Sequence, residues 1–263
     1  MKTRIISGIV MVALAIAVLT VGYLWLPLVI SLTVAALSAG VAFEIIHNAA
    51  GIKNKVIVTG VCVYAAITII ADYYLGIYGA VTTTVLYLIF AAFMILKRHA
   101  DFDLAKIALV YAMPLPFVFA FLCFGSIIVG KNGLYHLLLL LNFSCVCDMG
   151  AYFTGVTVGK TKLCPQISPN KTVEGAVGGI VLSLIVTLVI SLIFNRFNVL
   201  TLIFTIPFCV LGMLGDLFAS AIKRSVGLKD YSNLIPGHGG VLDRFDSMIM
   251  IIPAMFVFVH WSI

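Results

Sequence analysis

Long apolar stretches recur from one end of the chain to the other, separated by short polar segments. A helix of about 18 or more apolar residues is long enough to cross a hydrocarbon core about 30 Å thick. The pattern therefore predicts an all-α, polytopic membrane protein. We expect about nine transmembrane helices, at residues 5–21, 24–46, 56–71, 77–96, 107–129, 134–154, 175–194, 199–218 and 247–262.

Composition and charge agree with this pattern and add an orientation. Only 10% of the residues are charged and 63% are hydrophobic, whereas in soluble domains about a quarter of the residues are charged. Of the 16 Lys and Arg residues, all but Lys131 and Arg196 fall in loops on one side of the nine spans. Cytoplasmic loops are enriched in these residues, so the bias predicts a cytoplasmic N-terminus. It also accounts for the net charge of +6 without a nucleic acid partner, since basic helix ends meet anionic headgroups.

Polar residues are distributed unevenly along the chain. Residues 1–130 carry few of them beyond the loop charges, and the exception is Glu44, which is either an interfacial carboxylate or a functional one. Two polar segments, 148–175 and 216–246, hold six of the ten acidic residues. We interpret residues 1–263 as one integral membrane domain, with N-terminal helices of low motif content (1–130) and a catalytic half (142–250).

The first polar segment suits the binding of a polyanion. Asp148 lies near the end of a predicted span, where a carboxylate usually faces a cavity or a partner. The loop after it supplies hydroxyls and basic groups that can contact phosphate, namely Lys160, Ser168, Lys171 and Thr172. Thr172 and Glu174 are equally typical of the start of a helix, and both roles are compatible.

One phosphate-binding motif is excluded in this segment. Residues 155–161, GVTVGKT, resemble a P-loop, but three residues separate the glycines where the motif has four. The loop geometry that directs the backbone N–H groups at phosphate depends on that spacing. We therefore expect its lysines to act only as separate positive charges.

The second polar segment is more specific. Asp216 and Ser220 are four residues apart, and Lys223 and Arg224 follow one turn later, so a helix would align acid, hydroxyl and base on one face. Asp243 and Asp246 are three apart and would also share a helix face. Between them, PGHGG at residues 236–240 predicts a sharp turn that could bring two helices together.

Three convergent carboxylates with basic neighbours favour a Mg²⁺ site. Magnesium takes one or two protein carboxylates together with waters and substrate phosphates, which suits chemistry on nucleotides. The alternative is that Asp243, Arg244 and Asp246 form structural ion pairs with Lys223 and Arg224. His238 could be a general base, a phosphate donor or a turn residue, and we favour a phosphate contact or a positioning role.

Residues 220–246, SAIKRSVGLKDYSNLIPGHGGVLDRFD, resemble the signature of phosphatidate cytidylyltransferases, also called CDP-diacylglycerol synthases. DMGAYFTG and GKTKLCPQISPNKTVEGAVGG resemble the same family, so the likeness covers most of residues 142–250. Met149 is a departure, because the family commonly has Thr there. Any role of that hydroxyl is therefore in doubt in this chain.

The resemblance implies that CTP and phosphatidic acid react to give CDP-diacylglycerol and pyrophosphate, by attack of the lipid phosphate on the α-phosphorus of CTP. It implies that Asp216, Asp243 and Asp246 hold Mg²⁺, and it allows a second cation between these carboxylates. Lys223, Arg224 and Arg244 would contact phosphates. The substrate pocket would be formed by Asp148, Ser168, Lys171, Thr172 and Glu174, and the predicted binding set is completed by Lys160, Ser220, Lys229, Asp230 and His238.

Two other functions are kept as alternatives. A CTP-dependent lipid kinase would use the same groups but give CDP and a phosphorylated lipid. A cation-coupled transporter would account for nine spans and an acid at residue 148, although most of the acids lie at the cytoplasmic edge. In all three cases we expect a multi-pass protein of the cell (inner) membrane with its site facing the cytoplasm. The spacing of Gly175 and Gly179 is compatible with a homodimer.

Overall fold

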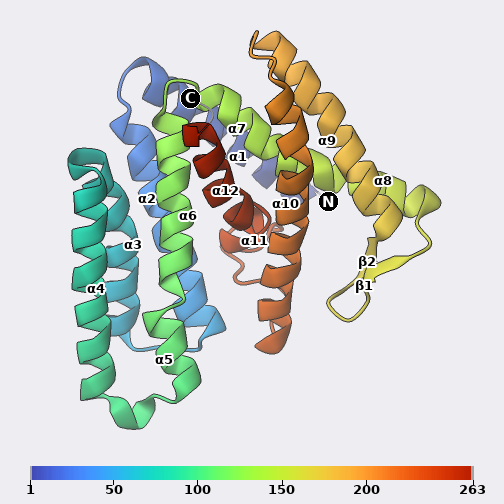
Figure 1. Ribbon diagram of the computed structural model, residues 1–263. Coiled ribbons are helices and arrows are strands. Elements are labelled where there is room, and N and C mark those ends of the chain that lie inside the picture. The colour runs from blue at the N-terminus through green and yellow to red at the C-terminus, as the bar shows by residue number, and fades with distance from the viewer. Residues whose placement is uncertain (1, 262–263) are drawn as a thin grey trace. The chain divides into compact units, whose positions relative to one another are not determined.

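The computed structural model describes residues 2–261, with side chains from residue 6 onward, and almost all of its regular structure is helical (Figure 1). Eight helical stretches in this described part are long and apolar enough to cross a membrane: Ile6–Leu24, Leu28–Ala49, Lys55–Leu75, Ile77–Lys97, Leu104–Val129, Gly133–Val158, Val173–Ile193 and Val199–Ser225. They coincide with the first eight predicted spans to within a few residues at most ends. The prediction of an all-α, polytopic membrane protein is confirmed.

The last predicted span, 247–262, corresponds to a shorter helix. This helix, α12, runs over Met248–Trp261 and has 14 residues, fewer than the eight longer stretches have. Residue 262 lies outside the described residues. The orientation of the N-terminus remains a prediction from the charge bias.

The chain divides into two compact units. Unit 1 contains Met1–Val129 and Val226–Arg244, and unit 2 contains Gly130–Ser225 and Phe245–Ile263. Residues 226–244, which carry most of the recognisable signature, therefore belong to the same unit as the N-terminal helices. The N-terminal half, which has few motifs of its own, thus forms one unit with most of the signature segment.

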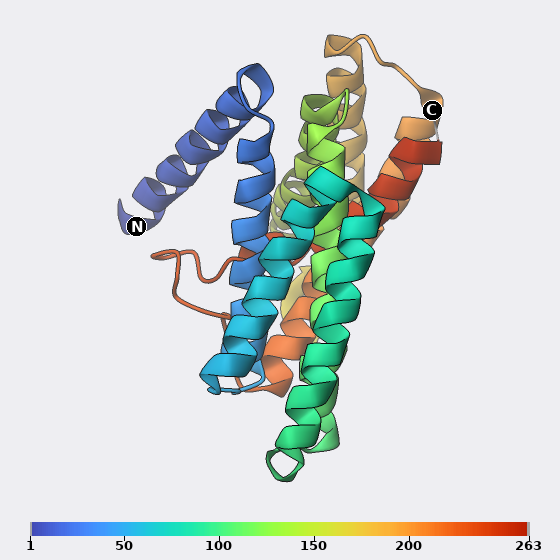
Figure 2. The ribbon, with the colours of Figure 1, turned by 90° about the vertical axis from the view of Figure 1, so that its left-hand side faces the viewer.

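Unit 1 is built mainly from the first six α-helices. Its elements are α1 (Lys2–Leu24), α2 (Leu28–Phe43), the π-helix η1 (Glu44–Ala49), α3 (Lys55–Leu75), α4 (Ile77–Lys97), the 3₁₀ turn η2 (His99–Asp101), α5 (Leu104–Tyr111), α6 (Pro114–Val129) and most of α11 (Leu242–Phe245). In Figure 2, α2, α3, α4 and α6 run side by side. Their facing apolar side chains, Val34, Val61, Ala65 and Phe121 among them, are buried.

Local sequence explains where these helices begin and end. Asn54 caps α3, because its side-chain oxygen accepts hydrogen bonds from the backbone N–H groups of Val56 and Ile57 at 3.0 and 3.3 Å. The fifth span is broken between α5 and α6 just before Pro114, whose ring nitrogen has no hydrogen to donate. Gly76, with φ of +61°, makes the tight connection between α3 and α4.

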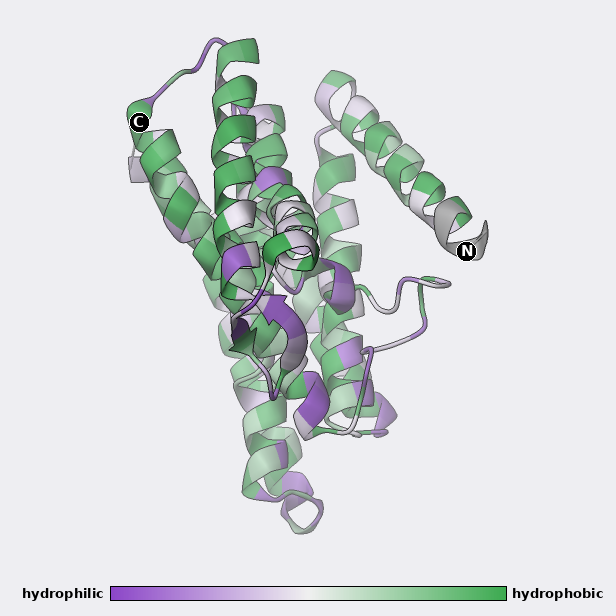
Figure 3. Ribbon diagram, turned by 90° about the vertical axis from the view of Figure 1, so that its right-hand side faces the viewer, coloured by the Kyte–Doolittle hydropathy of each residue, from purple (hydrophilic) through white to green (hydrophobic). Residues whose placement is uncertain are grey.

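Unit 2 contains the remaining helices and a short hairpin. Its elements are α7 (Gly133–Leu141), the π-helix η3 (Asn142–Val146), α8 (Cys147–Val158), β1 (Lys162–Cys164), β2 (Ser168–Thr172), α9 (Val173–Ile193), α10 (Val199–Ser225) and α12 (Met248–Trp261). β1 and β2 pair antiparallel, and Lys162 lies opposite Thr172. Figure 3 shows β2 as hydrophilic, in contrast to the apolar helices.

Glycines allow α8 and α9 to pack in direct backbone contact. A β-carbon at Gly179 would lie 2.5 Å from the carbonyl oxygen of Cys147, and one at Gly175 would lie 2.6 Å from the carbonyl oxygen of Ala151. Both distances are too short for a carbon atom. The GxxxG face of α9 is therefore used within the chain, and a homodimer, which remains a prediction, would need another surface.

Substitution of Gly179 by alanine is expected to destabilise unit 2 by about 1–3 kcal/mol, because the added methyl group forces two helix backbones apart. The midpoint of thermal unfolding in detergent should fall accordingly. Gly125→Ala on α6 is the matched control, since the nearest atom to its β-carbon would be Val34 Cγ1 at 3.8 Å, an ordinary contact. Equal midpoints for the two variants would contradict the close packing of α8 on α9.

Candidate active site

Asp216 and Asp246 are brought together by a glycine. A β-carbon at Gly215, in the middle of α10, would lie 2.7 Å from the carbonyl oxygen of Asp246 and 3.0 Å from that of Ser247. Only glycine lets the backbone of residues 246 and 247 lie directly against α10 at this level. Gly215 thus determines how closely the backbone of Asp246 approaches α10.

Asp216 is also bound by the hairpin and by its own helix. Lys171 on β2 reaches across 45 residues of sequence, and its Nζ lies 2.5 Å from Asp216 Oδ2. Ser220 Oγ donates to Asp216 Oδ1 at 3.3 Å, which confirms the predicted alignment along one face of α10. About a quarter of each side chain of the Lys171–Asp216 pair is exposed, so the pair remains open to a ligand.

Asp246 lies in the turn between α11 and α12 and is more deeply buried. Its Oδ2 is 4.0 Å from Lys223 Nζ, and its Oδ1 accepts a hydrogen bond from the Ser247 N–H at 2.8 Å. The Ser247 hydroxyl in turn lies 2.6 Å from the Ser144 hydroxyl, on the π-helix η3. Two irregular backbone segments, a turn and a π-helix, therefore meet beside this carboxylate.

Neighbouring groups shift the pKa of Asp246 in opposite directions. Burial raises the pKa of Asp246 to about 7, and the carboxylate of Asp216 adds to the rise, whereas the Ser247 N–H and the Lys223 ammonium group lower the pKa. Asp148, on α8, raises it further. We call Asp148, Asp216 and Asp246 the carboxylate cluster. They come from α8, α10 and the turn before α12, all in unit 2, and their negative charges repel one another.

Asp243 lies in unit 1 and has different partners. Its Oδ2 accepts hydrogen bonds from the backbone N–H groups of Tyr231 at 2.8 Å and Gly240 at 2.9 Å, and the residue is 6% exposed. The prediction that Asp243 and Asp246 share one helix face is wrong, because α11 ends at Phe245 and Asp246 follows in a turn. A helix of four residues is too short to present both.

Unit 1 contains a pocket of about 470 Å³ lined by the signature segment. The residues that line it are Lys229, Asp230, Asn233, Gly237, His238, Gly239 and Arg244. The lining contains a lysine, an arginine and a histidine but a single acid, so it suits an anion. Four residues that the sequence predicted for substrate or catalysis, Lys229, Asp230, His238 and Arg244, are brought together here.

PGHGG forms the predicted sharp turn, and three of its residues line this pocket. Gly237 and Gly239 have φ of +79° and +85°, and the Ile235 N–H donates to the carbonyl oxygen of Gly239 at 2.9 Å. Ser7, on α1, donates to the carbonyl oxygen of Pro236 at 2.9 Å and lies 2.8 Å from His238 Nδ1. The contact with Ser7 holds the His238 ring through Nδ1, and Nε2 is the ring nitrogen that lies outside this contact.

Most of the predicted hairpin residues have local structural roles. The Glu174 carboxylate accepts hydrogen bonds from the backbone N–H groups of Lys160 at 3.0 Å and Thr161 at 3.1 Å. Thr172 Oγ1 accepts from the Gly175 N–H at 3.1 Å and caps α9, which confirms the helix-start interpretation. Ser168 pairs with Cys164 in the hairpin, and Lys160 is exposed. Of this hairpin set, Lys171 contacts the carboxylate cluster, through Asp216.

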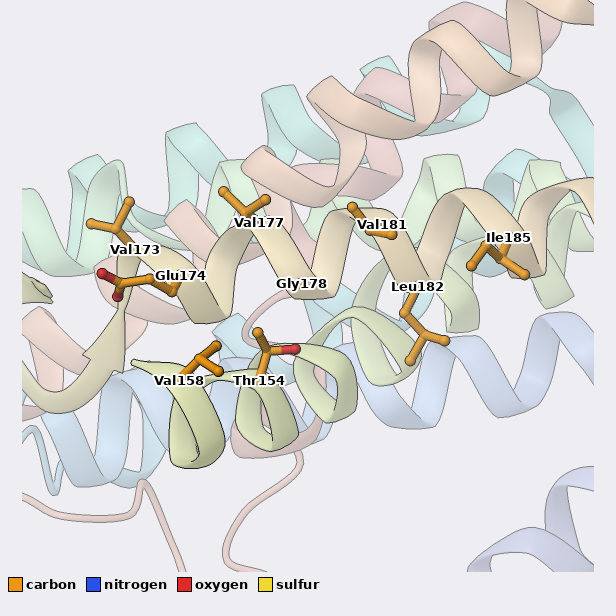
Figure 4. A pocket seen from close by; sticks show the side chains of 9 residues that line it. All are labelled: Thr154, Val158, Val173, Glu174, Val177, Gly178, Val181, Leu182 and Ile185. Atoms are coloured by element: carbon orange, nitrogen blue, oxygen red, sulfur yellow. The ribbon is translucent and has the colours of Figure 1, made fainter. Parts of the chain in front are cut away.

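A second hollow, of about 510 Å³, lies along α8 and α9 and is apolar (Figure 4). Thr154 and Val158 line it from α8, and α9 supplies the other side chains, Val177 and Val181 among them. The one charged residue in its lining, Glu174, is held by the hairpin amides described above. This groove therefore lacks the groups that nucleotide chemistry requires.

Comparison with known proteins agrees with this geometry. A sequence profile of the Cytidylyltransferase family matches residues 2–262. The chain belongs to this family. It is 44% identical over 128 residues to a phosphatidate cytidylyltransferase of Staphylococcus saprophyticus (48% of this chain, 49% of the relative). Proteins of the same name from Bacillus subtilis (39% over 141 residues; 51% and 52%) and Thermotoga maritima (31% over 181 residues; 66% and 67%) are also similar. In the first two alignments the chain spans about half the length of the relative.

The residues of this cytidylyltransferase-family chain fit a hard divalent cation. Asp216 and Asp246 offer carboxylate oxygens, the ligands that Mg²⁺ prefers. The pKa of Asp246 is raised first by burial and then by the carboxylate of Asp216, and a cation would relieve the repulsion between the two carboxylates. Among the described residues, no group of three or more His, Cys, Asp or Glu side chains lies close enough to hold an ion by itself. That is compatible with Mg²⁺, which keeps waters and takes substrate phosphates as further ligands. The metal assignment, Asp243 included, stays a prediction.

Sequence reasoning left one residue undecided that the structure places clearly. Glu44, in the second span, is 1% exposed, and its carboxylate binds the signature segment through the backbone N–H groups of Val241 and Leu242. The signal in the sequence was an acid at the end of an apolar run, where an unpaired charge is unfavourable. Its partners could not be identified from the sequence, because they lie almost 200 residues away.

Proposed function

We propose that this membrane protein transfers a cytidylyl group from CTP to phosphatidic acid, giving CDP-diacylglycerol and pyrophosphate. Membership of the Cytidylyltransferase family and the names of the similar bacterial proteins support this reaction. The observation that carries the proposal is the carboxylate cluster with its two lysines, Lys171 and Lys223, in a chain with few charged residues. The apolar helices provide the membrane location that a lipid substrate requires.

The proposed step is a displacement at phosphorus. An oxygen of the lipid phosphate forms a bond to the α-phosphorus of CTP, the bond from that phosphorus to the β-phosphate oxygen breaks, and pyrophosphate leaves with the electron pair. No covalent enzyme intermediate is required, so catalysis depends on positioning and on charge neutralisation. Mg²⁺ held by Asp216 and Asp246 would supply neutralisation of the phosphate oxygens. Asp243 and a second cation are further candidates for this centre.

The chain's own basic residues would bind and orient the phosphates. Lys229, His238 and Arg244 line the pocket of unit 1, which suits the triphosphate of CTP. Lys171 and Lys223, each paired with a carboxylate, hold positive charge beside Asp216 and Asp246. We place both groups of residues at the cytoplasmic face of the cell (inner) membrane, on the basis of the predicted charge asymmetry between the loops.

The first experiment incubates the purified protein in detergent with labelled CTP, phosphatidic acid and Mg²⁺, with and without EDTA. We expect CDP-diacylglycerol and pyrophosphate in equal amounts, a rate at least 100-fold lower with EDTA, and recovery when Mg²⁺ is added in excess, because carboxylates and phosphates bind the ion reversibly. Formation of CDP and a phosphorylated lipid would instead indicate a lipid kinase. Substrate flux into vesicles without conversion would indicate a transporter.

A further inference from the structure

The pocket of unit 1 is lined by a segment with little regular structure of its own. Between α10 and α11, residues 226–241 form turns and one isolated bridge, from Ile235 to Gly239. Yet this segment supplies six of the seven pocket-lining residues, and Arg244 follows shortly after it. Its shape must be held by contacts from elsewhere in unit 1, since short irregular segments do not hold one conformation alone.

Glu44 provides the most extensive of these contacts. Its Oε1 accepts hydrogen bonds from the Val241 N–H at 2.8 Å and from Ser232 Oγ at 2.6 Å, and its Oε2 accepts one from the Leu242 N–H at 2.8 Å. A β-carbon at Gly240 would lie 2.4 Å from Glu44 Oε1, so the glycine is what admits the carboxylate. One side chain thus binds the segment before the PGHGG turn and after it.

Two further contacts complete the anchoring. Asn48, also on η1 and four residues after Glu44, donates from Nδ2 to the carbonyl oxygen of Tyr231 at 2.8 Å. Asp243 binds the N–H groups of Tyr231 and Gly240, as described above. The π-helix η1 and Asp243 therefore fix residues 231–232 and 240–242 in one arrangement. π-Helical turns are frequent at functional sites, because they direct side chains that a regular helix would direct elsewhere.

We infer that Glu44 is a positioning residue for the nucleotide pocket: it sets the spacing of Lys229, His238 and Arg244 through the backbone of residues 232–242 without touching substrate itself. The inference rests on the proposed function, since it assigns the pocket to CTP. The two oxygens of Glu44 receive three donors from both sides of the turn that carries His238, so they determine how far apart the two sides lie.

The test is Glu44→Gln, which keeps the shape of the side chain and removes its ability to accept at both ends. A Gln amide has one acceptor oxygen, so the N–H of Val241 or that of Leu242 would face an NH₂ group. We expect the KM for CTP to rise at least tenfold, while the KM for phosphatidic acid changes less than twofold. Ser38→Ala is the matched control, because Ser38 is buried in α2, 2% exposed, and its hydroxyl has no hydrogen-bond partner among the residues that the structure describes. Its kinetic constants should equal those of the wild type.

A second readout separates this inference from the proposed function. Hydrogen–deuterium exchange of the peptide covering residues 240–245 should show protected amides at 241 and 242 in the wild type and faster exchange in Glu44→Gln, whether or not CTP is turned over. If the wild type forms no CDP-diacylglycerol, the proposed function fails, and exchange alone decides the anchoring. Unchanged exchange, or a wild-type KM for CTP in Glu44→Gln, would overturn the inference.

Should Glu44→Gln fail to fold, Ser232→Ala decides the matter, because it removes one of the three hydrogen bonds and leaves the carboxylate in place. We expect a smaller rise of the KM for CTP, about two- to fivefold, with kcat nearly unchanged. A purely structural role would instead lower the amount of folded protein and leave both KM values at those of the wild type. That result in Ser232→Ala would exclude a positioning role.

Discussion

Asp246→Asn is expected to remove Mg²⁺-dependent turnover and, at the same time, to stabilise the metal-free protein. The first effect follows from the loss of a carboxylate that we propose as a metal ligand, and should lower kcat at least 100-fold. The second follows from the pKa of Asp246, which the folded protein raises from 3.8 to about 7. Because the folded state disfavours the ionised form, the charge destabilises folding increasingly from about pH 4 to pH 7 and by a constant amount above.

The expected stabilisation at pH 8 is about 1–3 kcal/mol, since a shift of one pKa unit corresponds to about 1.4 kcal/mol and the carboxylate is partly exposed. Thermal unfolding in EDTA at pH 8 and pH 5 measures it, and the difference between variant and wild type should shrink at the lower pH. Asp101→Asn is the control: its carboxylate is exposed and pairs with Arg98 at 3.8 Å. Ordinary turnover in Asp246→Asn would remove this residue from the metal site.

Lys223→Met is expected to move the pH dependence of the reaction upward. Lys223 lies 4.0 Å from Asp246 and lowers its pKa, so removal of the ammonium group raises the pKa above about 7. At limiting Mg²⁺ the ion competes with the proton for this carboxylate, and the rate should rise with pH through that value. The variant should therefore lose about 10- to 100-fold of activity at pH 7 and recover part of it near pH 9.

The measurement is the pH profile of kcat/KM at a Mg²⁺ concentration below saturation. Lys131→Met is the control, because Lys131 is exposed in the loop before α7 and lies outside both candidate sites. Its profile should match that of the wild type. If Lys223→Met lowers the rate equally at every pH, Lys223 acts on substrate phosphate and not through Asp246.

The helical fold could be predicted largely from the apolar runs, because backbone groups in a membrane must be satisfied within the helix and only length and hydrophobicity are then needed. The first eight spans agree with the structure for this reason. The π-helices η1 and η3 could not be predicted, since residues 44–49 and 142–146 carry no pattern that separates them from α-helix. Both nevertheless place polar groups, Glu44 and Ser144, against the candidate site segments.

The site was predicted where its residues are local and missed where they are not. Asp216, Ser220 and Lys223 follow helix spacing, and α10 aligns Asp216 with Ser220 as expected. The same rule failed for Asp243 and Asp246. It assumes one continuous helix, but α11 ends at Phe245, between these two residues. Contacts between distant residues, such as that between Lys171 and Asp216, depend on how the elements pack. The spacing of residues along the sequence gives no information about that packing.

The anchoring of residues 232–242 by Glu44 also has a consequence for biogenesis. Glu44 precedes Val241 and Leu242 by 197 and 198 residues, so during synthesis it enters the membrane with the second helix long before its donors exist. Until then the chain carries an uncompensated acid in an apolar helix, a state that is unfavourable in lipid. In a chain whose synthesis stops before residue 241, Glu44 never receives these hydrogen bonds. The C-terminal part thus supplies the hydrogen-bond donors that this buried acid lacks until synthesis reaches residue 242.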